Sequence, residues 1–172
     1  MFLPDVNVLL YAIDSSSPQH APCRDWLNGV LNAEEPIGWA WNVLLGFVRI
    51  STNPKVLTTP LTLAEAFDYI EQWLSQPPSR IVEPSVRHAT LLRGLLDAVG
   101  TGRNCVSDAH LATLAIEHNG KVCSCDTDFG RFPGLTWLNP LTKSPSPAER
   151  PRTPRGFGRV ARVDTRRTWP GR

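Results

Sequence analysis

The sequence predicts an α/β protein in which helices cover both faces of a mostly parallel sheet. Short apolar segments alternate along the chain with amphipathic segments of about ten to fourteen residues, and this alternation is typical of βαβ units. The length of 172 residues leaves room for one such domain and a short extension. A content of 41% hydrophobic and 20% charged residues fits a packed core and excludes a wholly disordered chain.

The predicted strands are short and almost continuously apolar, as buried strands of a parallel sheet are. They cover residues 1–6, 37–39, 80–82, 121–124 and 135–138. Gly120 directly precedes the fourth of these strands, where the preceding helix ends. Because helix C-termini favour glycine in the left-handed conformation, we expect Gly120 to have a positive φ.

Apolar residues at helical spacing predict the helices. They cover residues 7–11, 20–31, 41–50, 62–74, 86–99 and 106–118. In the helix 62–74, Thr62 and Glu65 form the pattern of a capping box. Phe67, Ile70 and Leu74 share one face of this helix, and we expect that face to be buried.

Charge and composition divide the chain into a domain, residues 1–141, and a tail, residues 142–172. Residues 1–142 hold 9 Lys and Arg against 14 Asp and Glu, whereas residues 143–172 hold 9 against 2. The net charges are therefore −5 and +7, in keeping with +2 for the whole chain. The tail is rich in Pro, Gly and Arg and poor in aliphatic residues, so we expect it to be disordered.

The cysteines and the apolar segments exclude several classes of protein. The four cysteines and four histidines show none of the paired spacings of zinc sites, so we expect reduced, partly buried thiols. No apolar run approaches the roughly 20 residues that cross a bilayer, and the N-terminus lacks the basic region of a signal peptide. We therefore expect a soluble, cytoplasmic protein with no membrane partner.

Acidic residues stand where predicted strands end or a predicted helix begins. Asp5 follows the apolar start of the first strand, and Asp108 opens the last helix. Asp126 follows the fourth strand, and Asp128 stands two residues further on. The carboxyl ends of parallel strands meet at one edge of the sheet, where ligands bind in this class of fold. We expect these carboxylates to gather there.

Carboxylates that gather closely must take up a proton or a cation, and no Lys or Arg directly flanks these acids in the sequence. Oxygen-rich clusters suit Mg²⁺ or Mn²⁺. Such an ion lowers the pKa of water and neutralises charge on a phosphodiester, so the spacing favours metal-assisted phosphodiester hydrolysis. Each acid alone also fits an ordinary role, Asp108 in the first turn of a helix and Asp126 and Asp128 in a turn.

Three stretches of the chain match a known family in order and in spacing. They are LPDVNVLLYAID at residues 3–14, WAWNVLLGFVRISTNP at 39–54 and NCVSDAHLATLAIEHNGKVCSCDTDFGRFPGLTWLNPL at 104–141. The set resembles the PIN-domain ribonucleases and, among them, the VapC toxins of bacterial toxin–antitoxin pairs. The resemblance covers about residues 1–141, and its last stretch is the most specific.

The resemblance implies a three-layer α/β/α fold with a Mg²⁺- or Mn²⁺-dependent endoribonuclease site for single-stranded RNA at the carboxyl edge of the sheet. In the family pattern, Asp5 and Asp108 would be the principal metal ligands and catalytic residues, and Asp126 the third. Asp128 and Asn7 would be accessory residues. The resemblance also implies a small VapB-type antitoxin that blocks the site, and a homodimer.

One position departs from the family pattern. Many PIN domains carry a glutamate where this chain has Gly46, and no acid lies anywhere in residues 39–55. Because fewer carboxylates bind a metal ion less strongly, two hypotheses stay open. The chain is either an active ribonuclease toxin or a catalytically weak or inactive PIN domain that binds RNA or a partner protein.

Candidates for RNA contacts lie near the predicted site. They are Trp41 and Arg49, together with Trp39, because aromatic rings and guanidinium groups stack on bases or pair with phosphates. The arginines of the tail would either add attraction to RNA phosphates or have no role.

Two other families gather acids at strand ends but match this sequence poorly. Phosphatases of the haloacid-dehalogenase type carry Asp-x-Asp after the first strand, where this chain has Asp5, Val6 and Asn7. Receiver domains carry adjacent acids early in the chain and a lysine after a late strand, and this sequence has neither feature.

Overall fold

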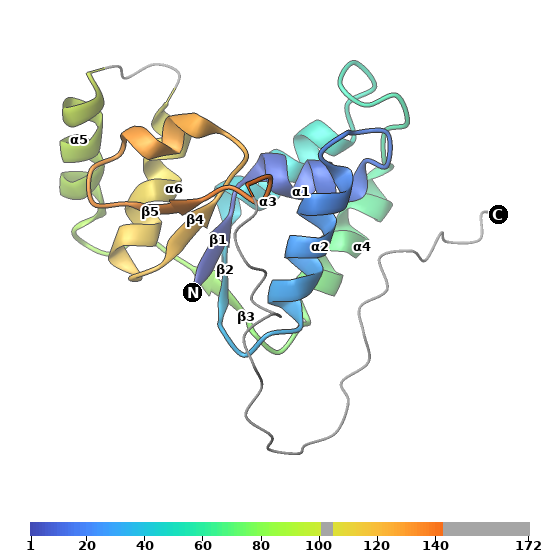
Figure 1. The fold of residues 1–172 in the computed structure, drawn as a ribbon, viewed down its shortest axis with the longest axis horizontal. Helices are drawn as coiled ribbons and strands as arrows, with labels where there is room; N and C mark the ends of the chain where they lie inside the picture. Colours follow the sequence, from blue (N-terminus) through green and yellow to red (C-terminus); the bar gives the residue numbers. More distant parts are fainter. Residues whose placement is uncertain (101–104, 143–172) are drawn as a thin grey trace.

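Five parallel strands form the centre of the molecule, whose computed structural model describes residues 1–100 and 105–142 (Figure 1). The strands are β1 (Phe2–Pro4), β2 (Ile37–Ala40), β3 (Ser79–Val82), β4 (Lys121–Cys123) and β5 (Thr136–Leu138). Their order in the sheet is β3-β2-β1-β4-β5, and every neighbouring pair is parallel. The predicted α/β class is therefore confirmed, and the strand positions agree with the sequence to within two or three residues.

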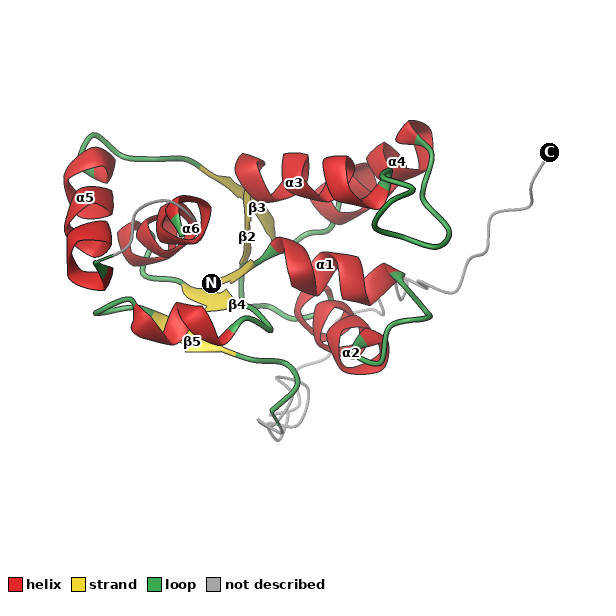
Figure 2. Ribbon diagram, turned by 90° about the horizontal axis from the view of Figure 1, so that it is seen from above, coloured by secondary structure: helices red, strands yellow, loops and turns green. Residues whose placement is uncertain are grey.

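Helices connect the strands and cover both faces of the sheet. They are α1 (Val6–Ile13), α2 (His20–Leu31), α3 (Trp41–Ser51), α4 (Leu63–Leu74), α5 (His88–Val99), α6 (Val106–Glu117) and the 3₁₀ helix η1 (Thr127–Arg131). Seen from above in Figure 2, α1 to α4 lie on one side of the sheet, and α5 and α6 lie on the other. This follows from topology, because the chain moves from β1 out to β3 and then returns to β4, and parallel crossovers are right-handed.

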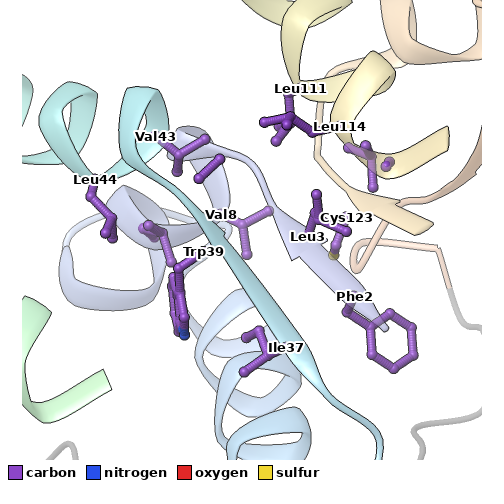
Figure 3. Close-up of a cluster of buried hydrophobic side chains, with 14 of the residues drawn as sticks. Phe2, Leu3, Val8, Ile37, Trp39, Val43, Leu44, Leu111, Leu114 and Cys123 are labelled. Atoms are coloured by element: carbon purple, nitrogen blue, oxygen red, sulfur yellow. The ribbon is translucent and has the colours of Figure 1, made fainter. Parts of the chain in front are cut away.

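Buried apolar side chains hold these layers together (Figure 3). Leu111 and Leu114 of α6 are buried over the centre of the sheet, where Leu3 of β1 is fully buried. On the opposite face, the ring of Trp39 in β2 stacks on Trp73 of α4, with 5.5 Å between the ring centroids. The sheet is therefore enclosed on both faces, and the loops and helix N-termini that follow the strands lie at its carboxyl edge.

Two expectations about local structure are wrong. The left-handed residue after α6 is Asn119, with φ of 50°, and Gly120 does not have a positive φ. Glycine is required at position 120 for space, because a Cβ there would lie 2.5 Å from Leu3 Cδ1. In α4 the capping box of Thr62 is present, but the buried face differs from the predicted one.

The buried face of α4 consists of Ala66, Ile70 and Trp73, whereas Phe67 is 45% exposed. The observed face shares Ile70 with the predicted one and is rotated from it by less than a quarter of a turn, which a helix with apolar residues around much of its circumference allows without losing amphipathic character. The stacking of Trp73 on Trp39 fixes the rotation that the protein adopts. Of the predicted tail, only Thr142 belongs to the described residues. No helix in the described part is long and apolar enough to span a bilayer.

Candidate active site

The strand order reverses between β1 and β4, so the loops that follow these two strands diverge at the carboxyl edge. This is where open parallel sheets bind ligands. Asp5 directly follows β1, and its backbone N–H donates to the carbonyl oxygen of Cys123, the last residue of β4, at 2.9 Å. The topology therefore places Asp5 at the position where a ligand is expected.

Asp5 is buried and held from three directions. Its side chain is the N-cap of α1, with Oδ1 accepting from the backbone N–H of Val6 at 2.7 Å. Its Oδ2 accepts from Asn7 Nδ2 at 2.6 Å and from Ser124 Oγ at 2.8 Å. With 7% of the residue exposed, the carboxylate is fixed in one orientation at the edge of the sheet.

Ser124 connects Asp5 to the loop that carries Asp126. Besides donating to Asp5, its fully buried hydroxyl oxygen accepts from Asn7 Nδ2 at 2.9 Å and from the backbone N–H of Asp126 at 3.0 Å. Asn7 holds the same loop, because its Oδ1 accepts from the backbone N–H of Cys125 at 3.1 Å. Ser124 is not among the site residues predicted from the sequence, although a hydroxyl at the buried end of a predicted strand is a signal that marks it.

The charges of other carboxylates act on Asp5. Burial raises the pKa of Asp5 from 3.8 to about 6, against the lowering effect of the hydrogen bonds from Ser124 and Val6. The negative charges of Asp108 and Asp126 raise it further. The pKa of Asp108 is raised as well, first by burial and then by the charges of Asp126 and Asp128.

Each of the other acids reaches this edge through its own element. Asp108 lies in the first turn of α6, and this helix packs on β1 and β4. Asp126 is exposed and caps η1, with its Oδ1 accepting from the backbone N–H of Asp128 at 2.9 Å. Asp128 is also exposed and lies 3.8 Å from Arg131 Nη1, so part of its charge is compensated. The structural and functional roles considered for these acids are thus compatible.

The donor set fits a divalent cation bound with water molecules. All the groups are carboxylate oxygens. Burial is the main cause of the raised pKa values of Asp5 and Asp108, and repulsion from the neighbouring carboxylates adds to it, so a positive charge at this edge is favoured. Among residues 1–100 and 105–142, no three His, Cys, Asp or Glu side chains are arranged to hold one ion by themselves. Magnesium usually keeps several water ligands and needs only one or two carboxylates, so an ion at this edge would complete its coordination with water.

The residues considered for RNA contact lie in different environments. Trp41 begins α3 at the end of β2 and is 46% exposed. Arg49 is exposed in the last turn of the same helix, roughly 12 Å further along its axis, so the two do not form one contact patch. The prediction that Trp39 contacts RNA is wrong, because this side chain is fully buried and its indole N–H donates to Ser79 Oγ at 2.9 Å.

Gly46 lies in the middle of α3, on the side that faces α1. A Cβ at this position would lie 3.5 Å from Val6 Cγ2, which is an ordinary van der Waals distance. The position therefore has room for a side chain next to the residue that follows Asp5. Packing does not require glycine there.

Comparison with known proteins agrees with this architecture. The family model described as "PIN domain" matches residues 2–135. Ribonuclease VapC37 of Mycobacterium tuberculosis (strain ATCC 25618 / H37Rv) is 45% identical over 140 residues, which are 81% of this chain and 97% of that protein. Ribonuclease VapC33 of the same strain is 40% identical over 141 residues, covering 82% of this chain and 99% of that protein. The chain therefore belongs to the PIN-domain family and, within it, to the VapC proteins.

Solved structures share the fold at low sequence identity. VapBC-1 from nontypeable Haemophilus influenzae has a TM-score of 0.59 and 11% identity, covering 81% of this chain and 97% of that one. VapBC2 from Rickettsia felis, bound to a DNA fragment from its promoter, has a TM-score of 0.57 and 19% identity, covering 80% of this chain and 97% of that one. At these identities the likeness concerns the fold alone, and it confirms the PIN-like arrangement.

Proposed function

We propose that this protein is the toxin of a VapBC-type toxin–antitoxin pair and that it cuts single-stranded RNA in a reaction that depends on Mg²⁺ or Mn²⁺. The observation that carries the proposal is the buried carboxylate of Asp5, whose pKa is raised to about 6 by burial and by the charges of Asp108 and Asp126. Relatives at 45% and 40% identity carry the name ribonuclease, which supports the same activity.

In this proposal Asp5, Asp108 and Asp126 hold the cation, directly or through water. When bound, the ion would lower the pKa of a water molecule and neutralise negative charge on the scissile phosphodiester. Asn7 and Ser124 are positioning residues, because both donate to Asp5 Oδ2 and so fix the direction of its free lone pairs. Asp128 adds negative charge at the rim and strengthens attraction for the cation.

Recognition of RNA would come from outside this acidic group. The carboxylates repel phosphates, so the substrate approaches only when a cation is present. The exposed ring of Trp41 offers a surface on which a base of a single strand can stack. Because bases of duplex RNA are already stacked and paired, this contact favours unpaired segments.

The partner in this proposal is a VapB-type antitoxin. VapBC complexes from two bacteria share the fold of this chain, and one of them is bound to promoter DNA. We propose that a small antitoxin covers the carboxyl edge of the sheet in the cytoplasm and that the toxin forms a homodimer. Co-expression with the product of a short neighbouring reading frame, followed by measurement of the mass of the complex in solution, tests this assignment.

Cleavage of a single-stranded RNA by the purified full chain tests the activity. The wild type should cut in Mg²⁺ or Mn²⁺ and stop when EDTA is added, and Asp5→Asn should abolish cutting. Asp68→Asn is the matched control, because Asp68 is an exposed carboxylate on α4 and the substitution removes the same charge. Cleavage that survives EDTA, or is equal in Asp5→Asn and Asp68→Asn, contradicts the proposed mechanism.

Gly46 supports a second candidate, a PIN domain that binds RNA or a partner without cutting. The helix offers room for a side chain here, yet no carboxylate is present. If this candidate holds, the wild type binds RNA in gel-shift assays but does not cut it at any Mg²⁺ or Mn²⁺ concentration. Gly46→Glu should then increase the affinity for Mn²⁺ measured by calorimetry, with Gly46→Gln as the uncharged control.

A further inference from the structure

Two cysteine side chains meet beside the candidate site. Cys23 lies on α2 and Cys125 in the loop between β4 and η1, and their Sγ atoms are 3.5 Å apart across a sequence separation of 102. Both are free thiols. Because the sulfur atoms of a disulfide are about 2.05 Å apart, closing the pair requires an approach of roughly 1.5 Å.

The two thiols differ in access to solvent. Cys23 is fully buried in the core, whereas Cys125 is partly exposed. An oxidant in solution therefore reaches Cys125 first, and Cys23 is the thiol that lies next to it. This is the arrangement in which an accessible cysteine is oxidised and a neighbouring one resolves it.

We propose that Cys23 and Cys125 form a reversible disulfide and that its closure weakens the site at the carboxyl edge. The first part stands on the geometry of the pair alone. The second part rests on the proposed function, because it concerns the loop that carries Asp126.

A hydroperoxide is the oxidant in this proposal. The sulfur of Cys125, having lost its proton, attacks one oxygen of hydrogen peroxide, the O–O bond breaks, and the other oxygen leaves as water after protonation. The sulfur of Cys23 then attacks the sulfenic acid at Cys125, the S–O bond breaks, and a second water leaves as the S–S bond forms. The two thiols lose two electrons in total, which the peroxide accepts, and a dithiol reductant reverses the change.

Closure should move the loop more than the helix. Cys23 belongs to the buried face of α2, which is packed into the core with Trp26 and Leu27. Cys125 is held mainly by hydrogen bonds of its backbone, at 3.1 Å from its N–H to Asn7 Oδ1 and at 3.5 Å from Asn139 Nδ2 to its carbonyl oxygen. A core helix resists displacement more than a loop does, because it would have to break close packing.

Cys125 is linked to the candidate site through a hydrogen bond to Asn7 and through its neighbours in the chain, Ser124 and Asp126. Asn7, which accepts from the Cys125 N–H, donates to Asp5 Oδ2 at 2.6 Å. Ser124 precedes Cys125 and Asp126 follows it, and these two are joined by the hydrogen bond from the Asp126 N–H to Ser124 Oγ. Pulling Cys125 toward α2 therefore disturbs the orientation of Asp5 and the position of Asp126 together.

Peptide mapping of the full chain after treatment with hydrogen peroxide tests the disulfide without reference to activity. We expect a protein lighter by two hydrogen atoms, a proteolytic fragment pair joined through Cys23 and Cys125, and a thermal midpoint raised by about 5 °C or more because a long loop is closed. Dithiothreitol should reverse all three. Cys105→Ala should behave as wild type, whereas Cys23→Ala and Cys125→Ala should not form the link.

Several results would overturn this part. They are a link that involves Cys123, a link between two chains, or oxidation of Cys125 to a sulfinic acid with Cys23 still reduced. Because Cys23→Ala could also lose core packing, its thermal midpoint in reductant serves as the check on folding, and Cys125→Ala provides the second, less buried variant.

The coupling to the site has its own assay. RNA cleavage in Mg²⁺ should fall at least about tenfold on oxidation and recover on reduction, and Cys125→Ala, which lacks the thiol that reacts first, should be insensitive to peroxide. Cys23→Ala keeps Cys125 but has no thiol to resolve it, so any loss of its cleavage in peroxide should not recover on reduction. Equal cleavage by oxidised and reduced wild type overturns the coupling. If the disulfide forms but neither redox state cuts RNA, the proposed function fails, and Mn²⁺ affinity measured by calorimetry in both states decides the coupling.

Discussion

The raised pKa of Asp5 predicts an unusual dependence of stability on pH. The folded protein holds the proton on Asp5 more tightly than the unfolded chain does, because the pKa rises from 3.8 to about 6 on folding. The contribution of this proton to stability is therefore fully present below pH 3.8 and is lost as the pH rises through about 6. Ionised Asp5 destabilises the fold at neutral pH in the absence of a cation.

The magnitude follows from the shift. At about 1.4 kcal/mol per pKa unit, a shift of about two units corresponds to about 3 kcal/mol over the full range, of which about 2 kcal/mol is gained between pH 8 and pH 4. Asp5→Asn removes the titrating group but also changes the hydrogen bonds to Asn7 and Ser124. That second change does not depend on pH, so it cancels when two pH values are compared.

Urea unfolding of wild type and Asp5→Asn at pH 8 and pH 4, in EDTA, measures the effect. As the pH falls from 8 to 4, the free energy of unfolding of the wild type should rise by about 2 kcal/mol relative to that of Asp5→Asn. A difference between wild type and Asp5→Asn that is the same at both pH values would refute the reasoning from burial and charge.

Three further substitutions test other parts of the account. Gly120→Ala should lower the free energy of unfolding by about 1–3 kcal/mol in urea, because the new Cβ meets the buried side chain of Leu3 at 2.5 Å. Gly46→Ala should raise the free energy of unfolding by about 0.5–1 kcal/mol. Glycine loses more backbone freedom than alanine when the helix forms, and a Cβ at this position has room. Ser124→Ala should slow RNA cleavage about tenfold and move the acid limb of its pH profile upward, because Asp5 loses a hydrogen bond that lowers its pKa.

Magnesium should stabilise the folded wild type, because a bound cation offsets the repulsion between the carboxylates at the site. A cation that binds only the folded state adds about 2.7 kcal/mol at one hundred times its dissociation constant. The thermal midpoint of the wild type should therefore rise with Mg²⁺ at pH 8, and that of Asp5→Asn should not. Equal shifts in the two proteins would mean that the ion binds elsewhere.

The order of elements was predictable because it depends on local pattern. Alternating strands and helices, the capping box of Thr62 and the position of Asp5 after β1 follow from residue types within one or two turns. Parallel strands bring their carboxyl ends to one edge, and the charges of Asp108 and Asp126 do act on Asp5 there. The role of each acid in catalysis stays a prediction.

Other features depend on contacts between distant segments. The rotation of α4 is set by the stacking of Trp73 on Trp39, and the requirement for glycine at position 120 is set by Leu3. Neither partner lies near in the sequence, so periodicity within one helix cannot reveal it. Trp39 likewise appears equivalent to Trp41 in the sequence, although one is fully buried and the other is 46% exposed.

Sequence by itself determined the fold class, the family and the set of acids at the strand ends, because these follow from periodicity and from motifs that are contiguous. Tertiary structure alone decided which groups touch them. Ser124 bridges Asp5 and Asp126, and Cys23 meets Cys125 from a helix more than one hundred positions away in the chain. Such pairs form where the sheet brings separate loops together, and the distance between two side chains in space is independent of their spacing in the sequence.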